Sequence, residues 1–213
     1  MINTKDFAQP PYNKMTLTGK GQVTVLPDLA ILRLGVQTTG LNLTATQSEN
    51  ARISQNVISS LQQLGITDIK TFQYLIETLY DYENGNRIDK GYSVRNLFEI
   101  RTSNLGLVGT IIDTAVNNGA NMVEFVNFEV ANPELYYQEA LNLAVNDAYH
   151  KAKSISTNLR IILNPIPTVI TENSAPPIPF SPVFLARGEG AFTTPVEPGN
   201  KLIEASVTVE FTY

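Results

Sequence analysis

The sequence contains no cysteine and no tryptophan, and its only histidine is His150. Disulfides and thiolate nucleophiles are therefore excluded, and a single histidine leaves no zinc site of ordinary composition. A Ser-His-Asp triad would have to use His150, but the chain has no Gly-x-Ser-x-Gly motif. We interpret His150 as a partly exposed helix residue, and we expect neither a catalytic residue, nor a metal, nor a cofactor.

Runs of positive charge and long apolar runs are missing as well. The chain carries 15 Lys and Arg against 20 Asp and Glu, a net charge of −5. This balance argues against nucleic acid, or an anionic membrane surface, as the main partner. No apolar run approaches the roughly 20 residues of a membrane-spanning helix. Residues 1–14 lack the plan of a secretory signal. We expect a cytoplasmic protein as the sequence stands, and a periplasmic or extracellular one if an export signal has been removed.

The strongest pattern in the chain predicts a helix over residues 132–160. Asn132 is a favourable N-cap, Pro133 suits the first helical position, and Glu134 complements the helix dipole. One predicted face, at spacings of three and four, contains Tyr137, Leu141, Ala144, Ala148, Ala152, Ile155 and Leu159. Three alanines in this stripe predict a helix that lies close against a sheet.

We interpret residues 1–14 as a flexible lead-in. A pair of strands follows, and a turn at Pro27-Asp28 joins the two strands. Gly19 and Gly21 interrupt the first strand, which indicates a bulge or a close backbone approach. Gly19-Lys20-Gly21 is not followed by a helix, so we favour a strand bulge over a phosphate-binding loop.

Two shorter helices and three further strands follow from the same periodicities, and one of these strands is a short one around residues 168–171. A helix over residues 44–64 buries Val57, Ile58, Leu61 and Leu64 and ends at Gly65. A helix capped by Ser103 or Asn104 buries Val108, Ile111, Ile112 and Ala115. The strand over residues 122–130 places Glu124 on the same face as Val126 and Phe128, so we expect Glu124 at a sheet edge or beside a basic group. The final strand, from Ile203, alternates apolar and polar residues.

A long hairpin is predicted over residues 72–100. Phe72, Tyr74, Ile76, Thr78, Tyr80 and Tyr82 share one strand face, and Ile88, Tyr92, Val94, Asn96, Phe98 and Ile100 share one face of the returning strand. A two-residue Asn84-Gly85 turn would put these two sets on opposite faces. We therefore predict a three-residue loop, 84–86, that pairs Tyr82 with Ile88 and Tyr74 with Asn96.

The charged residues of this hairpin indicate structure rather than catalysis. Glu77 and Asp81 share the polar face of one strand, and Arg95, Glu99 and Arg101 share that of the other. Paired carboxylates can perform acid–base chemistry when their pKa values are split. Cross-strand ion pairs on a wet face explain the pattern better.

The element order is therefore ββαββαβαββ, which predicts an α+β fold with helices on one face of a largely antiparallel sheet. We expect a single domain over residues 15–213. It includes a Pro-rich loop at 172–201, which is long enough to be functional or disordered.

The ordered motifs resemble those of the SIMPL-domain family, which includes bacterial envelope proteins of unknown biochemical activity. The matching pieces, in order, are Gly19-Lys20-Gly21, Pro27-Asp28-Leu29-Ala30, Asn50-Ala51, Gly65-Ile66, Gly91-Tyr92-Ser93-Val94, Gly119-Ala120-Asn121, the Ala144/Ala148/Ala152 helix and the segment 194–199. The resemblance implies an α+β fold of this element order, no cofactor and a tendency to self-assemble. It implies no mechanism.

We predict a non-enzymatic module that self-assembles or binds a protein partner. Its candidate interface residues are Tyr74, Tyr80, Tyr82 and Tyr92 of the hairpin and Phe180, Phe184, Leu185 and Phe192 of the Pro-rich loop. A core role for the tyrosines, and docking of the loop on its own domain, remain alternatives. The alternative function is a small-ligand binder or unrecognised hydrolase with a pocket beside the Pro-rich loop.

Overall fold

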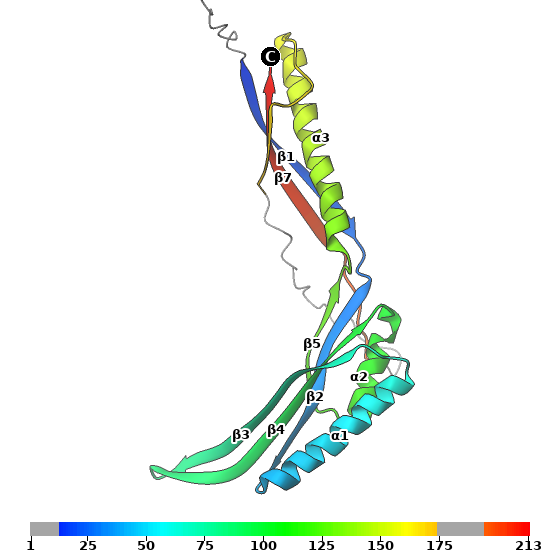
Figure 1. Ribbon diagram of the computed structural model, residues 1–213, viewed down its shortest axis with the longest axis vertical. Coiled ribbons are helices and arrows are strands. Elements are labelled where there is room, and N and C mark those ends of the chain that lie inside the picture. Colours follow the sequence, from blue (N-terminus) through cyan, green and yellow to red (C-terminus); the bar gives the residue numbers. More distant parts are fainter. Residues whose placement is uncertain (1–12, 174–193) are drawn as a thin grey trace, which may run out of the picture. The chain divides into compact units, whose positions relative to one another are not determined.

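The computed structural model describes residues 13–173 and 194–213. Within this part, seven strands, three α-helices and one short 3-10 helix follow the order β1-β2-α1-β3-β4-η1-α2-β5-α3-β6-β7 (Figure 1). The predicted order and the α+β class are therefore confirmed. The strands form two antiparallel sheets rather than one, and the chain divides into two compact units. The predicted single domain over residues 15–213 stays a prediction.

The first unit contains a three-stranded sheet and one long helix. β1 (Lys14–Val25), β7 (Lys201–Thr212) and β6 (Val169–Glu172) form the sheet in the order β1-β7-β6. α3 (Pro133–Leu159) lies along β1 and β7 (Figure 1). The alternation predicted for β7 is confirmed, because Ile203, Ala205, Val207, Val209 and Phe211 are all buried.

The buried face of α3 differs from the predicted one. Its buried residues are Tyr137, Ala140, Ala144, Ala148, Ala152 and Ser156. Ala140 and Ser156 take the places predicted for their larger neighbours Leu141 and Ile155, and Leu159 is exposed. Only small residues fit on the face of α3 that contacts the sheet, because the backbone of α3 lies so close to β1. Pro133 begins the helix as predicted, but the Asn132 side chain makes no capping hydrogen bond.

Gly19 and Gly21 of β1 permit this close approach. A Cβ atom on Gly19 would overlap the carbonyl oxygen of Ala144, and one on Gly21 would overlap that of Ala140. β1 pairs with β7 in one continuous register through both glycines, so the predicted bulge is wrong. Of the two readings of these glycines, the close backbone approach is the one observed.

Polar contacts fasten β1 and α3 together as well. Asp147 Oδ2 accepts hydrogen bonds from the backbone N–H of Lys20 at 2.8 Å and from Lys151 Nζ at 2.7 Å. Lys151 Nζ also donates to the carbonyl oxygen of Thr18 at 2.9 Å. The bond from Lys151, and then the one from Lys20, hold the pKa of Asp147 below its ordinary value.

The strand pair predicted around Pro27-Asp28 is not formed. β1 pairs with β7, whereas β2 (Leu29–Gly40) belongs to the sheet of the second unit. The Asp28 carboxylate accepts a hydrogen bond from the backbone N–H of Ala131 at 2.7 Å, and the Asp28 N–H donates to the carbonyl oxygen of Glu129 at 3.0 Å. Pro27-Asp28 therefore connects two strands that belong to different sheets, instead of closing a hairpin between them.

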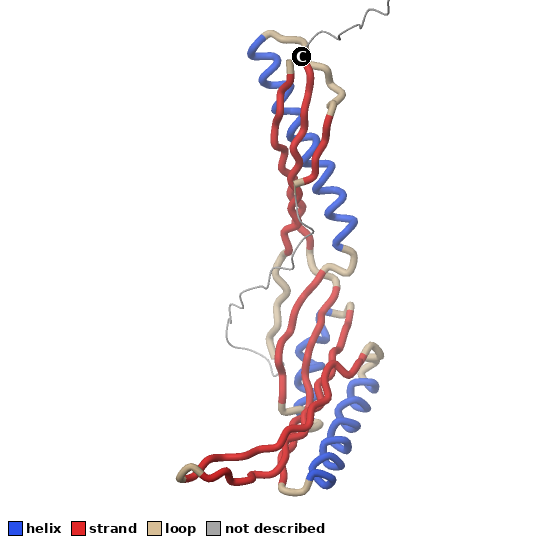
Figure 2. The backbone as a smooth tube through the Cα atoms, turned by 60° about the vertical axis from the view of Figure 1, so that its left-hand side comes forward, coloured by secondary structure: helices blue, strands red, loops and turns tan. Residues whose placement is uncertain are grey.

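The second unit has a four-stranded sheet in the order β3-β4-β2-β5, with two helices against one face (Figure 2). The further strands are β3 (Ile69–Glu83), β4 (Asn86–Thr102) and β5 (Met122–Glu129). α1 (Leu43–Gln63) packs on β2 and β4, and α2 (Val108–Asn117), preceded by η1 (Leu105–Leu107), packs beside α1. The core contains the predicted Val57, Leu61, Val108, Ile111, Ile112 and Ala115.

α1 inserts a polar side chain into this core. Asn50 is completely buried, and its Nδ2 donates to the carbonyl oxygens of Val36, at 3.0 Å, and Val94, at 2.9 Å. One amide therefore ties together β2 and β4. Ser54 Oγ donates to Asn50 Oδ1 at 3.3 Å and accepts from Asn96 Nδ2 at 3.2 Å, which extends the network toward β4.

The ends of α1 and α2 agree in part with the predictions. Gly65 ends α1 with φ of +83°, as predicted, and Asn42 caps its start by accepting from the Ala45 N–H at 3.0 Å. Gly119 has φ of +105° after α2. Asn104 precedes η1 without a side-chain capping bond, so the predicted capping role is not observed.

Glu124 lies at a β-bulge on an edge strand. Arg33 faces Phe125 and Leu34 faces Val123, so Glu124 is the additional residue between them. β5 ends the sheet, and the Glu124 side chain is exposed. The expected edge position is confirmed. The bulge explains how an acid can occupy a position that simple alternation places on the same face as Val126 and Phe128.

Candidate interaction surface on the four-stranded sheet

The β3–β4 hairpin closes with a two-residue turn. Asn84 and Gly85 have φ values of +52° and +82°, and Tyr82 lies opposite Arg87. The predicted three-residue loop and the pairing of Tyr82 with Ile88 are therefore wrong. Asn-Gly tolerates two successive positive φ values, and this local preference decided the turn.

A β-bulge in β4 reconciles that turn with the buried face. Tyr80 faces Asp89 but Leu79 faces Gly91, so Lys90 is an additional residue in β4. Beyond the bulge, Tyr74 faces Asn96, as predicted. Gly91 has φ of +96°, and a Cβ atom there would overlap the carbonyl oxygen of Gly40. The bulge therefore depends on a residue without a side chain.

Four large residues on one face of β3 are exposed to solvent. Their exposed fractions are 45% for Tyr74, 39% for Ile76, 52% for Tyr80 and 64% for Tyr82. The facing residues, Asn96 and Val94 among them, lie on the side of the sheet that α1 covers. We call Tyr74, Ile76, Thr78, Tyr80 and Tyr82 the β3 row.

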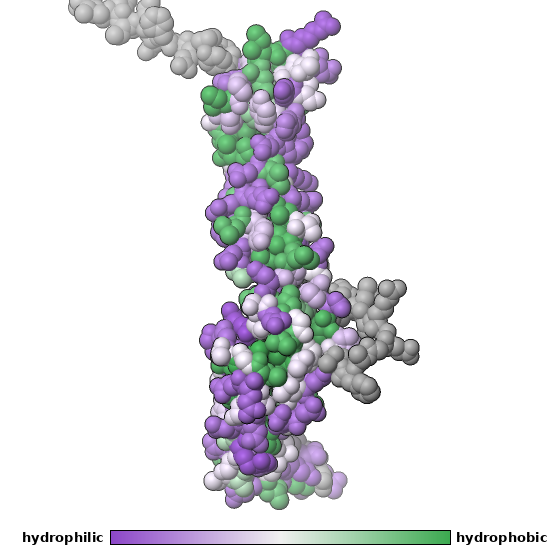
Figure 3. Space-filling model, turned by 90° about the vertical axis from the view of Figure 1, so that its right-hand side faces the viewer, coloured by the Kyte–Doolittle hydropathy of each residue, from purple (hydrophilic) through white to green (hydrophobic). Residues whose placement is uncertain are grey.

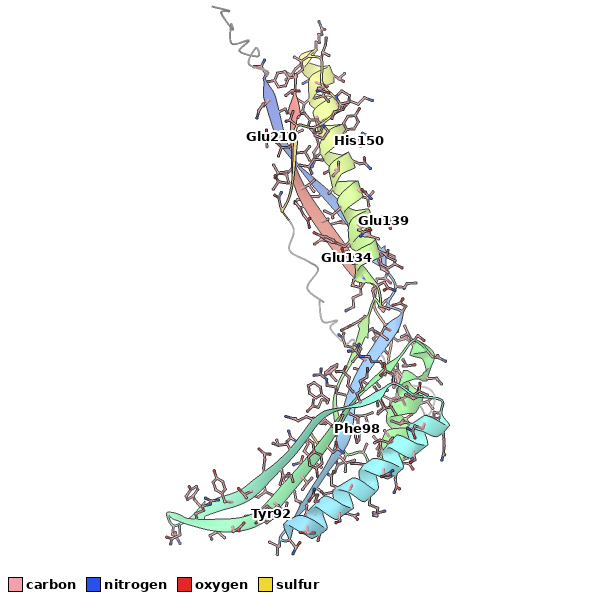
Figure 4. All side chains as sticks on the ribbon, in the orientation of Figure 1. Tyr92, Phe98, Glu134, Glu139, His150 and Glu210 are labelled. Atoms are coloured by element: carbon pink, nitrogen blue, oxygen red, sulfur yellow. The ribbon has the colours of Figure 1, made fainter. Side chains whose placement is uncertain are left out.

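The β3 row is exposed because the helix layer is narrower than the sheet. α1 packs on β2 and β4, and the turn end of the hairpin lies away from α1 in both views (Figures 1 and 2). β3 is also the terminal strand of the sheet. Tyr92, on β4 beside Thr78, is half-buried, and Phe98 lies farther along β4 in the core (Figure 4). The tyrosines of the hairpin thus share one face of the sheet. A second bulge, at Phe72, places the Phe72 side chain off that face.

The tip of the row has an ordered side-chain arrangement. Tyr80 and Tyr82 meet edge to face, with ring centroids 5.9 Å apart. The Arg87 guanidinium lies 4.2 Å from the centroid of the Tyr80 ring. Such contacts hold aromatic side chains in defined positions at the surface. The tip therefore presents a preformed aromatic surface.

The opposite face of this sheet carries a charged cluster. Glu99 accepts hydrogen bonds from Arg33 at 2.9 Å and from Arg101 at 2.9 Å. The bond from Arg101, followed by that from Arg33, holds the pKa of Glu99 below its ordinary value. The Arg33 guanidinium also lies 3.4 Å from the Phe72 ring centroid and 4.7 Å from that of Phe125. Sequence reasoning placed Glu99 and Arg101 on one face but missed Arg33 and Phe72, and Phe72 joins the cluster only through its bulge.

The predicted cross-strand ion pairs are thus formed in part. Glu99 and Arg101 take part, with Arg33 of β2 as the partner across the strands. Within the described ranges, Glu77, Asp81 and Arg95 form no ion pair.

His150 lies on α3 with an exposed side chain, as expected (Figure 4). Its ring is 5.8 Å from that of Tyr149. Over residues 13–173 and 194–213, no group of three His, Asp or Glu side chains could hold a metal ion. In the same ranges, no helix is both long and apolar enough to cross a bilayer.

A hollow of about 380 Å³ lies between η1–α2 and residues 194–198. Thr194 fastens this segment to α2, because its Oγ1 donates to Asp113 Oδ1 at 2.6 Å. The lining includes Gly106, Gly109 and Pro195, and its only ionisable side chain among the described residues is the exposed Glu197. More of its lining surface is polar than apolar, whereas a typical ligand pocket has mainly apolar walls.

The remaining candidate interface residues, Phe180, Phe184, Leu185 and Phe192, lie outside the described residues, as does most of the predicted lead-in. Their proposed contacts therefore stay predictions.

Comparisons with known proteins agree with the resemblance seen in the motifs. The SIMPL family, described as proteins of unknown function (DUF541), matches residues 15–211. A 26 kDa periplasmic immunogenic protein of Brucella melitensis is 29% identical over 196 residues, which cover 89% of this chain and 77% of that protein. The uncharacterised protein YggE of Escherichia coli K12 is 27% identical over 154 residues, covering 71% of this chain and 63% of YggE.

Proposed function

We propose that this protein, which belongs to the SIMPL family, is a non-enzymatic self-assembling module whose contact surface is the β3 row. The observation that carries the proposal is the exposure of Tyr74, Ile76, Tyr80 and Tyr82 side by side on an edge strand. Exposed aromatic residues grouped in this way are typical anchors of protein interfaces. The family itself is one of unknown function, so its membership supplies no activity.

A second copy of the chain is the partner that best fits this surface. An exposed strand edge can pair with its own copy about a two-fold axis. If Thr78 faced Thr78 across that axis, Tyr74 would face Tyr82 and Ile76 would face Tyr80. Because the row is nearly symmetric about Thr78, both halves of such a pairing would bury large residues against each other.

A periplasmic location is part of the proposal. The Brucella melitensis relative is named as a periplasmic protein. A chain without cysteine folds independently of the redox state of its compartment, so this location is chemically compatible with the sequence.

The test is the solution mass of the protein, measured by light scattering over a range of concentrations. We expect a defined oligomer for the wild type and a smaller mass for Tyr80→Thr/Tyr82→Thr, since threonine keeps the strand propensity and removes the rings. Leu202→Thr is the matched control, because Leu202 is a large residue on a strand with an exposed fraction of 55%.

Either of two results would overturn the proposal. One is a monomeric wild type at high concentration. The other is an oligomer whose mass is the same in the tyrosine variant. Circular dichroism would establish that each variant retains the wild-type secondary structure.

A further inference from the structure

Three aliphatic side chains are exposed at the end of the first unit where α3 finishes. The exposed fractions are 59% for Leu159, 91% for Ile162 and 72% for Ile166. We call residues 159–168 the aliphatic loop. Ile162 is the most exposed large hydrophobic residue in the described part of the chain. Leaving aliphatic groups in water is unfavourable, so their grouping in one loop requires an explanation.

The aliphatic loop is held in place by backbone hydrogen bonds. The Ile161 N–H donates to the Ser156 carbonyl at 3.0 Å, and the Asn164 N–H donates to the Thr212 carbonyl at 2.9 Å. Asn164 Oδ1 in turn accepts from the Ile166 N–H at 3.1 Å. Ile161 and Leu163 are half-buried, whereas Ile162 and Ile166 are exposed. The backbone of the aliphatic loop is therefore held in place, while the side chains of Ile162 and Ile166 are exposed to solvent.

Positive charge accompanies these aliphatic groups. Between Asp147 and Glu172 the chain has no acidic residue, although it carries 20 in all. That interval includes Lys153 and Arg160, which form no ion pair within the described ranges. Of the three acids of α3, Glu134 and Glu139 lie toward its other end (Figure 4), and Asp147 pairs with Lys151 at 2.7 Å. The nearest acid on the sheet, Glu210, pairs with Lys14 at 3.0 Å.

We propose that the aliphatic loop binds the surface of an anionic lipid bilayer. Ile162 and Ile166 enter the boundary between headgroups and acyl chains, while Lys153 and Arg160 remain among the anionic headgroups. The net charge of −5 argues against an anionic membrane as the main partner of the whole chain, but screening limits the reach of distant acids to about 10 Å in ordinary salt, so the charges beside the aliphatic loop decide this contact.

A bilayer fits this loop better than a protein partner does. A stable protein interface buries about 800 Å² on each partner, which a loop tip with three aliphatic side chains does not provide. A bilayer accepts a narrow tip, because insertion needs apolar side chains and neighbouring cations rather than a wide complementary surface. Figure 3 shows hydrophobic and hydrophilic residues side by side at the upper end of the view, the end at which Figure 1 marks the C-terminus.

The absence of tryptophan makes a direct test possible. Ile162→Trp introduces the only tryptophan into the full chain. Its emission is measured with vesicles of phosphatidylcholine alone and with vesicles that also contain phosphatidylglycerol. The matched control is Leu135→Trp, because Leu135 is 65% exposed in the first turn of α3. We expect a blue shift, and quenching by brominated acyl chains, for Ile162→Trp with phosphatidylglycerol vesicles only.

Sedimentation with the same vesicles tests the contribution of these side chains to lipid binding without an introduced tryptophan. We expect Ile162→Ser/Ile166→Ser to weaken binding by at least roughly tenfold for each isoleucine that enters the bilayer. We expect Lys153→Glu/Arg160→Glu to abolish the preference for phosphatidylglycerol. Leu135→Ser should bind as the wild type does.

Three results would overturn the proposal. The first is an unchanged emission spectrum in the presence of millimolar phosphatidylglycerol vesicles. The second is a blue shift that depends on protein concentration without lipid, which would assign the loop to contact between copies. The third is equal binding by the wild type and Ile162→Ser/Ile166→Ser. The proposal does not depend on assembly through the β3 row, because the tryptophan reports lipid contact whatever the mass of the protein.

Discussion

A Cβ atom on Gly19 of β1 would overlap the backbone carbonyl oxygen of Ala144 in α3. The strand and the helix meet here backbone to backbone, so neither can move away without breaking contacts along its length. The same arrangement recurs at Gly21 and Ala140. Position 19 is therefore a sensitive site for testing the packing of the first unit.

We expect Gly19→Ala to lower the free energy of unfolding by about 1–3 kcal/mol, because the added methyl group forces α3 away from β1. Urea denaturation followed by circular dichroism measures this change. Gly199→Ala is the control, since a Cβ atom there meets nothing within 4 Å, and its effect should stay within about 0.5 kcal/mol. Equal effects of the two substitutions would contradict the close approach.

We expect Asn50→Ala to destabilise the protein by about 2–3 kcal/mol. The substitution removes two buried hydrogen bonds to the carbonyl oxygens of Val36 and Val94 and leaves a cavity under α1. Asn56→Ala, at an exposed position of the same helix, should cost far less. Unfolding midpoints in urea provide the comparison, and a loss as small as that of Asn56→Ala would show that the two hydrogen bonds from Asn50 do not stabilise the fold.

Two glycines of the hairpin allow backbone strain to be separated from close packing. Gly85 and Gly91 both have positive φ, but only Gly91 lies against another backbone, that of Gly40. We expect Gly85→Ala to cost about 1 kcal/mol and Gly91→Ala at least about 1 kcal/mol more. Amide hydrogen exchange of β3 and β4 would show whether the loss centres on the bulge. Equal costs would mean that Gly91 is needed only for its φ.

The Glu99 cluster should make stability depend on pH. Hydrogen bonds from Arg101 and Arg33 lower the pKa of Glu99 from its ordinary value of 4.5. A lowered carboxylate pKa stabilises the fold fully above the ordinary value, and this stabilisation is lost as pH falls through the folded-state pKa. We therefore expect Glu99→Gln to be less stable than the wild type at neutral pH, and the difference to shrink below about pH 4.5.

Urea midpoints at neutral and acidic pH measure that convergence. Glu124→Gln, which replaces an exposed acid on the edge strand, serves as the control and should follow the wild-type pH profile. A difference between Glu99→Gln and the wild type that stays constant with pH would show that the loss comes from packing and not from charge.

Local patterns predicted the elements well. The start of α3 at Pro133, the cap at Gly65 and the alternation of β7 all follow from interactions among residues close in the chain. The exposed row of tyrosines was also visible as a pattern, since period-two spacing places Tyr74, Tyr80 and Tyr82 on one face. The pattern did not indicate whether a helix would cover that face.

Contacts between distant residues account for the wrong predictions. β1 pairs with β7, 176 to 198 positions away, and no signal at Pro27-Asp28 distinguishes that pairing from a hairpin. In the long hairpin, the Asn84-Gly85 turn and the buried face require different registers, and a bulge at Lys90 satisfies both. Gly91, directly after the additional residue, takes the positive φ that this bulge needs.

The amino-acid sequence by itself determined the order of the elements, the α+β class and the family, because these depend on periodicity, caps and ordered motifs. Only the tertiary structure decided which strands pair and which helix face is buried. It also decided which apolar residues remain in water. The face of α3 shows why: Ala140 is buried in preference to Leu141 because Gly21 brings the two backbones together. The distance between the two backbones is set only when β1 and α3 pack together, so neither element determines it alone.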